Sequence, residues 1–161
     1  MSERLRSATG LAADAGPLRL DQHICFALYS ASAMVTRLYR PLLEPLNLTY
    51  PQYLAMLVLW EKSPRTVGEL GDALRLDSAT LTPLIKRLEA AGYVTRQRDA
   101  ADERRVLIAP TPGGQALRER AAGVPHAMRC QLPIETEELV ALRSILDQLN
   151  QTQAVQSKSV A

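Results

Sequence analysis

Residues 66–92, TVGELGDALRLDSATLTPLIKRLEAAG, decide the fold of this chain. Thr66 can cap a first helix, because Glu69 stands three positions on and completes a capping box. A short turn at 75–77 leads to a second helix that starts at Ser78 and is closed by the last glycine of the stretch. Two helices joined by so short a turn predict a helix-turn-helix unit.

Two β-prone runs follow this unit, at 94–98 and 104–108, and the polar segment DAADE at 99–103 separates them. Such a pattern predicts a hairpin. Helix, turn, helix and basic hairpin in this order predict a winged helix-turn-helix, whose second helix enters the DNA major groove. Charge alone leaves open that the basic side chains form only a solvated face, because residues 86–105 hold six basic and four acidic side chains. The order of the elements favours DNA binding.

The second helix of the unit has an apolar stripe on one face and small, hydroxylated and basic residues on the other. We expect the latter face to read bases, with its small groups near thymine methyls and its longer side chains on base edges or phosphates. Arg104 has an alternative role, an internal pair with Asp102 that holds the turn of the wing. The expected DNA-binding residues are Ala79, Thr80, Thr82, Pro83, Lys86, Arg87, Arg104 and Arg105.

Composition limits the remaining possibilities. A chain of 161 residues with 47% hydrophobic content fits a single domain with a core, and a net charge of +2 leaves DNA binding to the local placement of basic residues. No signal peptide or membrane-spanning stretch is expected, so the sequence predicts a cytoplasmic protein whose thiols are normally reduced. The helical spacing of apolar residues from Leu20 is interrupted at Pro41, and further helices are expected at 51–61, 112–129 and 135–150.

The chain has two cysteines, Cys25 and Cys130. The two histidines, His23 and His126, do not complete a metal-ligand pattern with them, so we expect no metal and no cofactor. An isolated cysteine is usually a small buried hydrophobe. The alternative is a pair of regulatory thiols, which the wide spacing of the two residues suits better than a metal clip.

Tyr39 follows Cys25 by 14 positions, which places both on nearly the same face of one helix but ~21 Å apart along its axis. They cannot touch within one chain. If two copies of this helix cross antiparallel near Ser32, Cys25 of one subunit comes opposite Tyr39 of the other. The small side chains at 30–33 would allow the close approach, although Tyr39 could equally pack only within its own subunit.

Several segments resemble a known family. LEAAGYV at 88–94 and DER at 102–104 resemble the marks of the MarR family of dimeric winged-helix regulators. LDQHICFALY at 20–29, LTYPQY at 48–53 and LDSATLTPL at 76–84 resemble the organic hydroperoxide sensors of that family, called OhrR. The small Ala-Ala tip of the wing departs mildly from the more polar wings of the family.

The resemblance extends from about Leu20 to Asn150 and implies roles for four residues. Cys25 corresponds to the peroxide-reactive cysteine, and Tyr39 and Tyr50 correspond to two tyrosines of the partner subunit that hydrogen-bond it. Cys130 corresponds to the resolving thiol of the two-cysteine branch. The resemblance thus implies a homodimeric repressor, not an enzyme, that binds a pseudo-palindromic operator when reduced and releases it when an organic hydroperoxide oxidises Cys25 and an intersubunit disulfide with Cys130 forms.

Three alternatives remain open: a MarR-type repressor gated by a small aromatic ligand with passive cysteines, a thiol peroxidase, and an adaptor that uses the winged helix for protein contact. The expected fold class is mainly α with a small β-hairpin wing, a winged helix-turn-helix with N- and C-terminal dimerisation helices. Its expected divisions are a disordered tail at 1–17, an N-terminal dimerisation helix region at 18–50, the DNA-binding domain at 51–110, C-terminal dimerisation helices at 111–150 and a flexible tail at 151–161.

Overall fold

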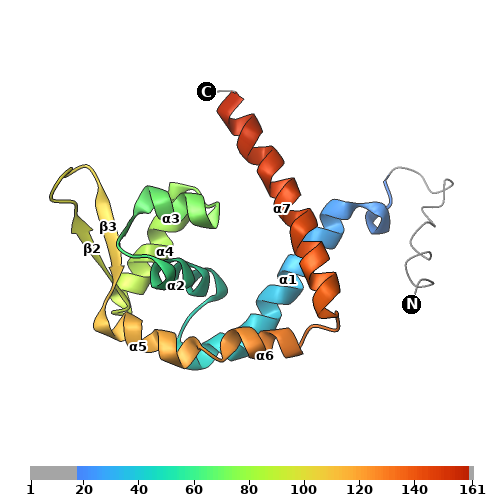
Figure 1. The fold of residues 1–161 in the computed structure, drawn as a ribbon, viewed down its shortest axis with the longest axis horizontal. Coiled ribbons are helices and arrows are strands. Elements are labelled where there is room, and N and C mark those ends of the chain that lie inside the picture. The colour runs from blue at the N-terminus through green and yellow to red at the C-terminus, as the bar shows by residue number, and fades with distance from the viewer. Residues whose placement is uncertain (1–17, 160–161) are drawn as a thin grey trace. The chain divides into compact units, whose positions relative to one another are not determined.

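The computed structural model describes residues 18–159, with side chains as far as Gln151, so the tail expected at 1–17 lies outside the described residues. The fold class is confirmed as mainly helical with a wing of short strands (Figure 1). In chain order the elements are η2 (Leu20–Gln22), α1 (Ile24–Leu43), η3 (Glu44–Leu46), α2 (Tyr50–Glu61), β1 (Arg65–Thr66), α3 (Val67–Leu74), α4 (Ser78–Ala90), β2 (Val94–Arg98), β3 (Val106–Pro110), α5 (Pro112–Ala121), α6 (Val124–Cys130) and α7 (Thr136–Ser159).

The chain forms two compact units, one that ends at Val124 and one that starts at Pro125. The first unit contains the helix-turn-helix, the wing and α5, and the second contains most of α6 and all of α7. No helix in the described part of the chain is long and apolar enough to cross a membrane.

Side-chain caps start both helices of the helix-turn-helix; the cap at Thr66 was predicted from the sequence, and the cap at Asp77 was not. Thr66 Oγ1 accepts a hydrogen bond from the Glu69 amide at 3.1 Å, and the Thr66 amide donates to Glu69 Oε2 at 2.7 Å. Asp77 Oδ1 accepts from the Thr80 amide at 2.7 Å and caps α4. These bonds hold the pKa of both carboxyls below its ordinary value, and Gly92, with φ at 76°, ends the second helix as expected.

The wing is a three-stranded antiparallel sheet in the order β1-β3-β2, in which Arg98 pairs with Val106. The strand β1 was not expected, because it is only two residues long and gives no pattern to detect. The last strand begins at Val106, two residues later than the expected start at Arg104. The Arg105 amide donates to the Asp102 carbonyl at 2.9 Å, and the Asp99 amide donates to the Arg105 carbonyl at 2.9 Å, so the chain is still turning at Arg105.

Three helix boundaries differ from those expected. The first helix continues through Pro41 to Leu43, because a proline one turn from a helix end removes only one hydrogen bond. The helix expected at 112–129 is two helices, α5 and α6, separated at Ala122 and Gly123. The last helix extends beyond Asn150 to Ser159, so backbone assigned to a flexible tail is helical that far.

The core of the first unit joins α2, α4, α5 and the wing. Tyr53, Met56 and Leu59 of α2 are almost fully buried, as the apolar character of that helix predicts. The indole of Trp60 donates to the Gly114 carbonyl at 2.9 Å and ties α2 to α5. A Cβ on Gly114 would lie 2.0 Å from the Tyr93 carbonyl oxygen, so only glycine fits there. These two contacts therefore fix the start of α5 against α2 and against the segment before β2.

Candidate DNA interface and redox site

The structure divides α4 into two faces, as the sequence predicts. Leu81, Leu84, Ile85 and Leu88 are buried and fix the orientation of the helix. On the other side Ala79, Thr80, Pro83, Lys86 and Arg87 are exposed, and Thr82 is half-buried. In the described part of the chain neither Lys86 nor Arg87 forms an ion pair. Both cations are therefore available to a ligand.

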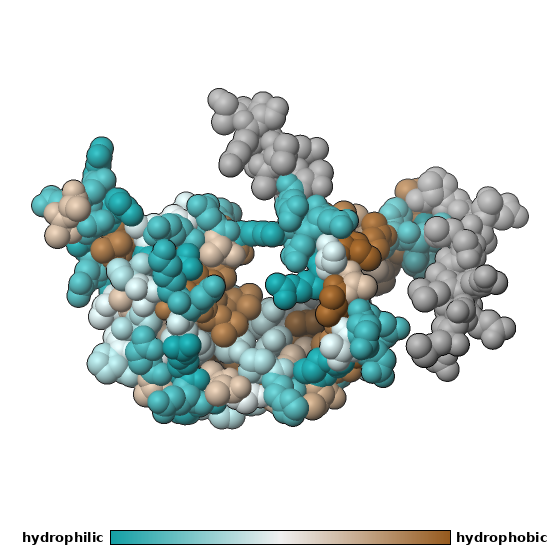
Figure 2. All heavy atoms as spheres, viewed as in Figure 1, coloured by the Kyte–Doolittle hydropathy of each residue, from teal (hydrophilic) through white to brown (hydrophobic). Residues whose placement is uncertain are grey.

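The wing arginines are held by carboxylates of the same loop. Arg104 Nε lies 3.2 Å from Asp102 Oδ1, which also accepts from the Arg104 amide at 3.1 Å, so the internal pair considered for Arg104 is confirmed. Arg105 Nη1 lies 3.7 Å from Asp99 Oδ2. The Arg104 side chain is still 91% exposed, and Figure 2 shows mainly hydrophilic residues on the wing. The pairs orient the two guanidinium groups without removing them from solvent.

Tyr39 and Tyr50, which are far apart in the sequence, lie together. Their ring centroids are 4.5 Å apart in a stacked arrangement, and the ring of Tyr53 is 5.8 Å from that of Tyr39. Burial raises the pKa of Tyr39 and Tyr50, and for Tyr39 the neighbouring tyrosines add to the effect. Among the described residues neither hydroxyl has a hydrogen-bond partner. Two protonated donors are thus available side by side.

Both thiols are free and exposed in the single chain, so the interpretation that they are buried hydrophobes is wrong. Cys25 lies in the first turn of α1, on the same continuous helix as Tyr39. Cys130 is the last residue of α6, where its Sγ lies 3.7 Å from His126 Nε2. The two cysteines belong to different compact units.

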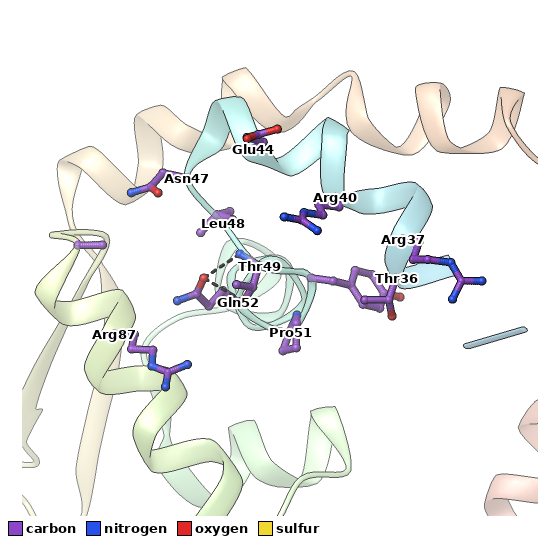
Figure 3. Close-up of a pocket in the computed structure, with 12 residues that line it drawn as sticks. Thr36, Arg37, Arg40, Glu44, Asn47, Leu48, Thr49, Pro51, Gln52 and Arg87 are labelled. Atoms are coloured by element: carbon purple, nitrogen blue, oxygen red, sulfur yellow. Dashed lines mark hydrogen bonds between the residues drawn. The ribbon is translucent and has the colours of Figure 1, made fainter. Parts of the chain in front are cut away.

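A cavity of about 650 Å³ next to Tyr50 was not anticipated. It lies between α1, the start of α2 and the end of α4, and Figure 3 shows Arg40 and Arg87 entering it from different helices. Arg37 also lines it, and Glu44 is the one acidic residue in its wall. None of the three arginines forms an ion pair with a described residue. The i, i+3 spacing of Arg37 and Arg40 around Tyr39 is the signal that could have revealed this basic wall.

Comparison with known proteins agrees with this geometry. The family model described as "Transcriptional regulator SarA/Rot" matches residues 37–120. The chain is 45% identical over 135 residues to the organic hydroperoxide resistance transcriptional regulator of Bacillus subtilis (strain 168). The aligned residues cover 84% of this chain and 92% of that relative.

Solved structures extend the likeness to the fold. Reduced AbfR of Staphylococcus epidermidis, solved bound to DNA, is 36% identical with a TM-score of 0.71, over 84% of this chain and 94% of that one. Apo MarR of E. coli is 25% identical with a TM-score of 0.65, over 79% of this chain and 96% of that one. The chain is a DNA-binding transcriptional regulator, not an enzyme, and it belongs to the MarR family of winged helix-turn-helix proteins.

Proposed function

We propose that this protein is a homodimeric repressor that senses organic hydroperoxides through Cys25 and releases its operator when an intersubunit disulfide with Cys130 forms. The observation that carries the proposal is the stacked pair Tyr39 and Tyr50, whose protonated hydroxyls have no partner in the described part of the chain. The similarity to a regulator of organic hydroperoxide resistance supports the same reading.

The tyrosines suit the chemistry of a peroxide-reactive thiol. The thiolate is the nucleophile, and a hydroxyl donor stabilises it while its ring keeps the surroundings apolar. Such a rim favours an organic peroxide over hydrogen peroxide. Cys25 and Tyr39 lie on one helix about 14 residues apart, which is too far for contact within the chain. The tyrosines would therefore serve Cys25 of a second subunit.

The exposed apolar side chains of α1 support a dimer. A single chain exposes large hydrophobic residues along the N-terminal part of this helix and in the segment just before it, at a density that a soluble monomer seldom shows. Antiparallel crossing of two such helices near Ser32 would cover them and bring Cys25 opposite the tyrosine pair. The residues concerned are Leu18, Leu20, Ile24, Phe26, Leu28, Tyr29 and Met34.

The oxidation consumes one peroxide. The Cys25 thiolate attacks the terminal peroxide oxygen, the O–O bond breaks, and the alkoxide takes a proton and leaves as an alcohol, so Cys25 becomes a sulfenic acid. The Cys130 thiolate then attacks the Cys25 sulfur, which forms the disulfide and releases hydroxide that is protonated to water. Closing a disulfide requires Cα atoms within about 7 Å. Movement to that distance would shift the two winged units and disturb the spacing of half-sites one DNA turn apart.

In the reduced dimer, we propose that the exposed face of α4 reads the major groove. Ala79, Thr80, Thr82 and Pro83 would lie near base edges, and Lys86 and Arg87 would reach bases or phosphates. Arg104 and Arg105 would place the wing on the backbone. The operator would be pseudo-palindromic because the dimer has two-fold symmetry.

The test is operator binding of the wild type and of Cys25→Ser before and after an organic hydroperoxide. The variant should bind the operator as the wild type does but should not release it, because a hydroxyl at this position is a poor nucleophile toward peroxide. Release of operator by the treated variant would contradict peroxide sensing through Cys25.

The basic cavity favours a second candidate function, a repressor gated by a small aromatic acid with passive cysteines. Three unpaired arginines around one carboxylate make the cavity a site for an anion, and Arg87 lies on the helix assigned to DNA. In that case a non-oxidising aromatic carboxylate such as salicylate would release the operator from the Cys25→Ser variant. Under the first proposal it would not.

A further inference from the structure

The thiol of Cys130 has a side-chain partner within its own helix. Its Sγ lies 3.7 Å from Nε2 of His126, one helical turn earlier, and this is the one side-chain hydrogen bond of either residue in the described part of the chain. The two belong to α6 and to the same compact unit, so the pair needs no second element to form. Both side chains are exposed.

We propose that His126 acts as the base that prepares Cys130 to resolve the sulfenic acid of Cys25. This inference rests on the proposed function, and it adds a residue to which no role in the redox cycle has been assigned. One histidine and one thiol are too few ligands for a metal site, so the pair is better explained by proton transfer.

Cys130 lies at the C-terminal end of α6, and this position disfavours its thiolate. Cysteines that form thiolates readily often lie at helix N-termini, where the helix dipole favours an anion. Cys130 lies at the opposite end, where carbonyl groups without intrahelical partners carry partial negative charge and oppose a thiolate. A side chain that takes the thiol proton would offset this effect, and His126 is the side chain that contacts the thiol.

Neighbouring charges do not take over this role. Arg129, the adjacent cation on α6, directs its guanidinium away from the thiol, to the Leu132 carbonyl at 3.5 Å and to Thr136 Oγ1 at 3.2 Å. The described acidic side chains of this unit form no hydrogen bond with His126 or Cys130. The imidazole is thus free to exchange a proton with the thiol.

The step balances without a further reagent. His126 Nε2 takes the Cys130 proton, the resulting thiolate attacks the sulfur of the Cys25 sulfenic acid, and the S–O bond breaks as the S–S bond forms. The imidazolium returns the proton to the departing hydroxide, which leaves as water. The oxidised sulfur of Cys25 is the oxidant, and the peroxide has already supplied its two oxidising equivalents.

Alkylation of Cys130 tests the pair without peroxide or DNA. In the Cys25→Ser background Cys130 is the one cysteine left, and its rate of reaction with iodoacetamide can be followed by mass spectrometry across a pH series. His126→Gln, which keeps a polar side chain, should slow the reaction at neutral pH about three- to tenfold and should change how the rate depends on pH. His23→Gln, at the other histidine of the chain, is the matched control and should change neither. Circular dichroism of each variant checks that its helix content equals that of its parent.

Disulfide formation gives a second readout. After one equivalent of cumene hydroperoxide, the chain with His126→Gln and both cysteines should hold the Cys25 sulfenic acid, trapped by dimedone, about three to ten times longer than the wild type. Equal alkylation rates and equal pH profiles for His126→Gln and its parent would overturn the inference, as would an unchanged sulfenic acid lifetime. A wild type that never forms the sulfenic acid would instead contradict the proposed function and leave the alkylation result to decide the role of His126.

Discussion

The DNA-reading unit (residues 50–121) and the N-terminal segment of the chain (residues 18–34) differ in how much of their packing one chain supplies. The first has a closed hydrophobic core, in which Leu70, Ile85 and Leu88 are almost fully buried. The second exposes most of its large apolar side chains and its cysteine. The difference indicates that one chain is sufficient to fold the DNA-reading unit, whereas the proposed redox sensing would need a second copy.

The largest expected effect concerns the covalent link between copies. After mild oxidation the wild type should run as a covalent dimer on a non-reducing gel, and Cys130→Ser should give none, because Cys25 then has no resolving thiol and proceeds toward sulfinic acid. Cys25→Ser is the control and should also give no covalent dimer. A disulfide-linked band of monomer size would contradict the proposal of an intersubunit bond, since Cys25 and Cys130 would then be joined within one chain.

A change in the DNA-reading unit should reduce the stability of the single chain. Gly114→Ala places a Cβ 2.0 Å from the Tyr93 carbonyl and should lower the free energy of unfolding by about 2–4 kcal/mol. Gly113→Ala is the matched control, since its Cβ would have ordinary contacts at 3.5 Å, and it should change stability by less than about 1 kcal/mol. Urea denaturation measures both, and equal stabilities would show that α5 is not fixed as described.

The tyrosine pair lies between the two regions in the sequence, with Tyr39 on α1 and Tyr50 at the start of the DNA-reading unit. Tyr39→Phe and Tyr50→Phe should slow the oxidation of Cys25 without abolishing operator binding, because each removes a proposed hydrogen bond to the thiolate worth about 1.5–3 kcal/mol. Tyr93→Phe removes a hydroxyl that donates to the Leu46 carbonyl at 3.2 Å and should not change the oxidation rate. Stopped-flow oxidation measures the rates. If both Tyr39→Phe and Tyr50→Phe were oxidised at the wild-type rate, the two tyrosines would serve only in core packing.

Within the DNA-reading unit, the basic residues should differ in how much they contribute to operator binding. Lys86→Ala should weaken operator binding by about 1–3 kcal/mol if the side chain contacts a base edge, and less if it contacts phosphate. Arg105→Ala should fall in the same range, because its contact with Asp99 is long, at 3.7 Å. Replacing Arg104 should matter less, because its guanidinium lies closer to its partner Asp102, at 3.2 Å. Fluorescence anisotropy at two salt concentrations separates base from phosphate contacts. Unchanged binding in both Lys86→Ala and Arg105→Ala would rule out this DNA interface.

The parts of the fold that depend on local sequence could be predicted. The Thr66 capping box, the apolar stripe of α4 and the glycine after it are short-range patterns that were predicted, and the structure has all of them. The continuation of α1 past Pro41 could not be predicted, because tertiary packing of Leu43 outweighs the loss of one hydrogen bond. The two-residue strand β1 is held only by its pairing with β3.

In the candidate site too, some features could be predicted from the sequence and others depend on tertiary packing. Residue roles for Cys25, Tyr39, Tyr50 and Cys130 came from resemblance, and the structure adds that the two tyrosines stack. The contact between Tyr39 of α1 and Tyr50 of α2 could not be predicted from sequence spacing alone, because it depends on how the two helices pack. The pair of Arg104 with Asp102 was considered from the sequence, whereas the pair of Arg105 with Asp99 depends on a turn whose length was underestimated.

The most direct measurement of peroxide sensing is a titration of the operator-bound wild type with cumene hydroperoxide, followed by fluorescence anisotropy, with cumyl alcohol as the matched non-oxidising control. Release should be complete at about one equivalent of hydroperoxide per chain and should be reversed by dithiothreitol. It should not occur with the alcohol. Release by the alcohol, or release that needs a large excess of hydroperoxide, would contradict sensing by oxidation of Cys25.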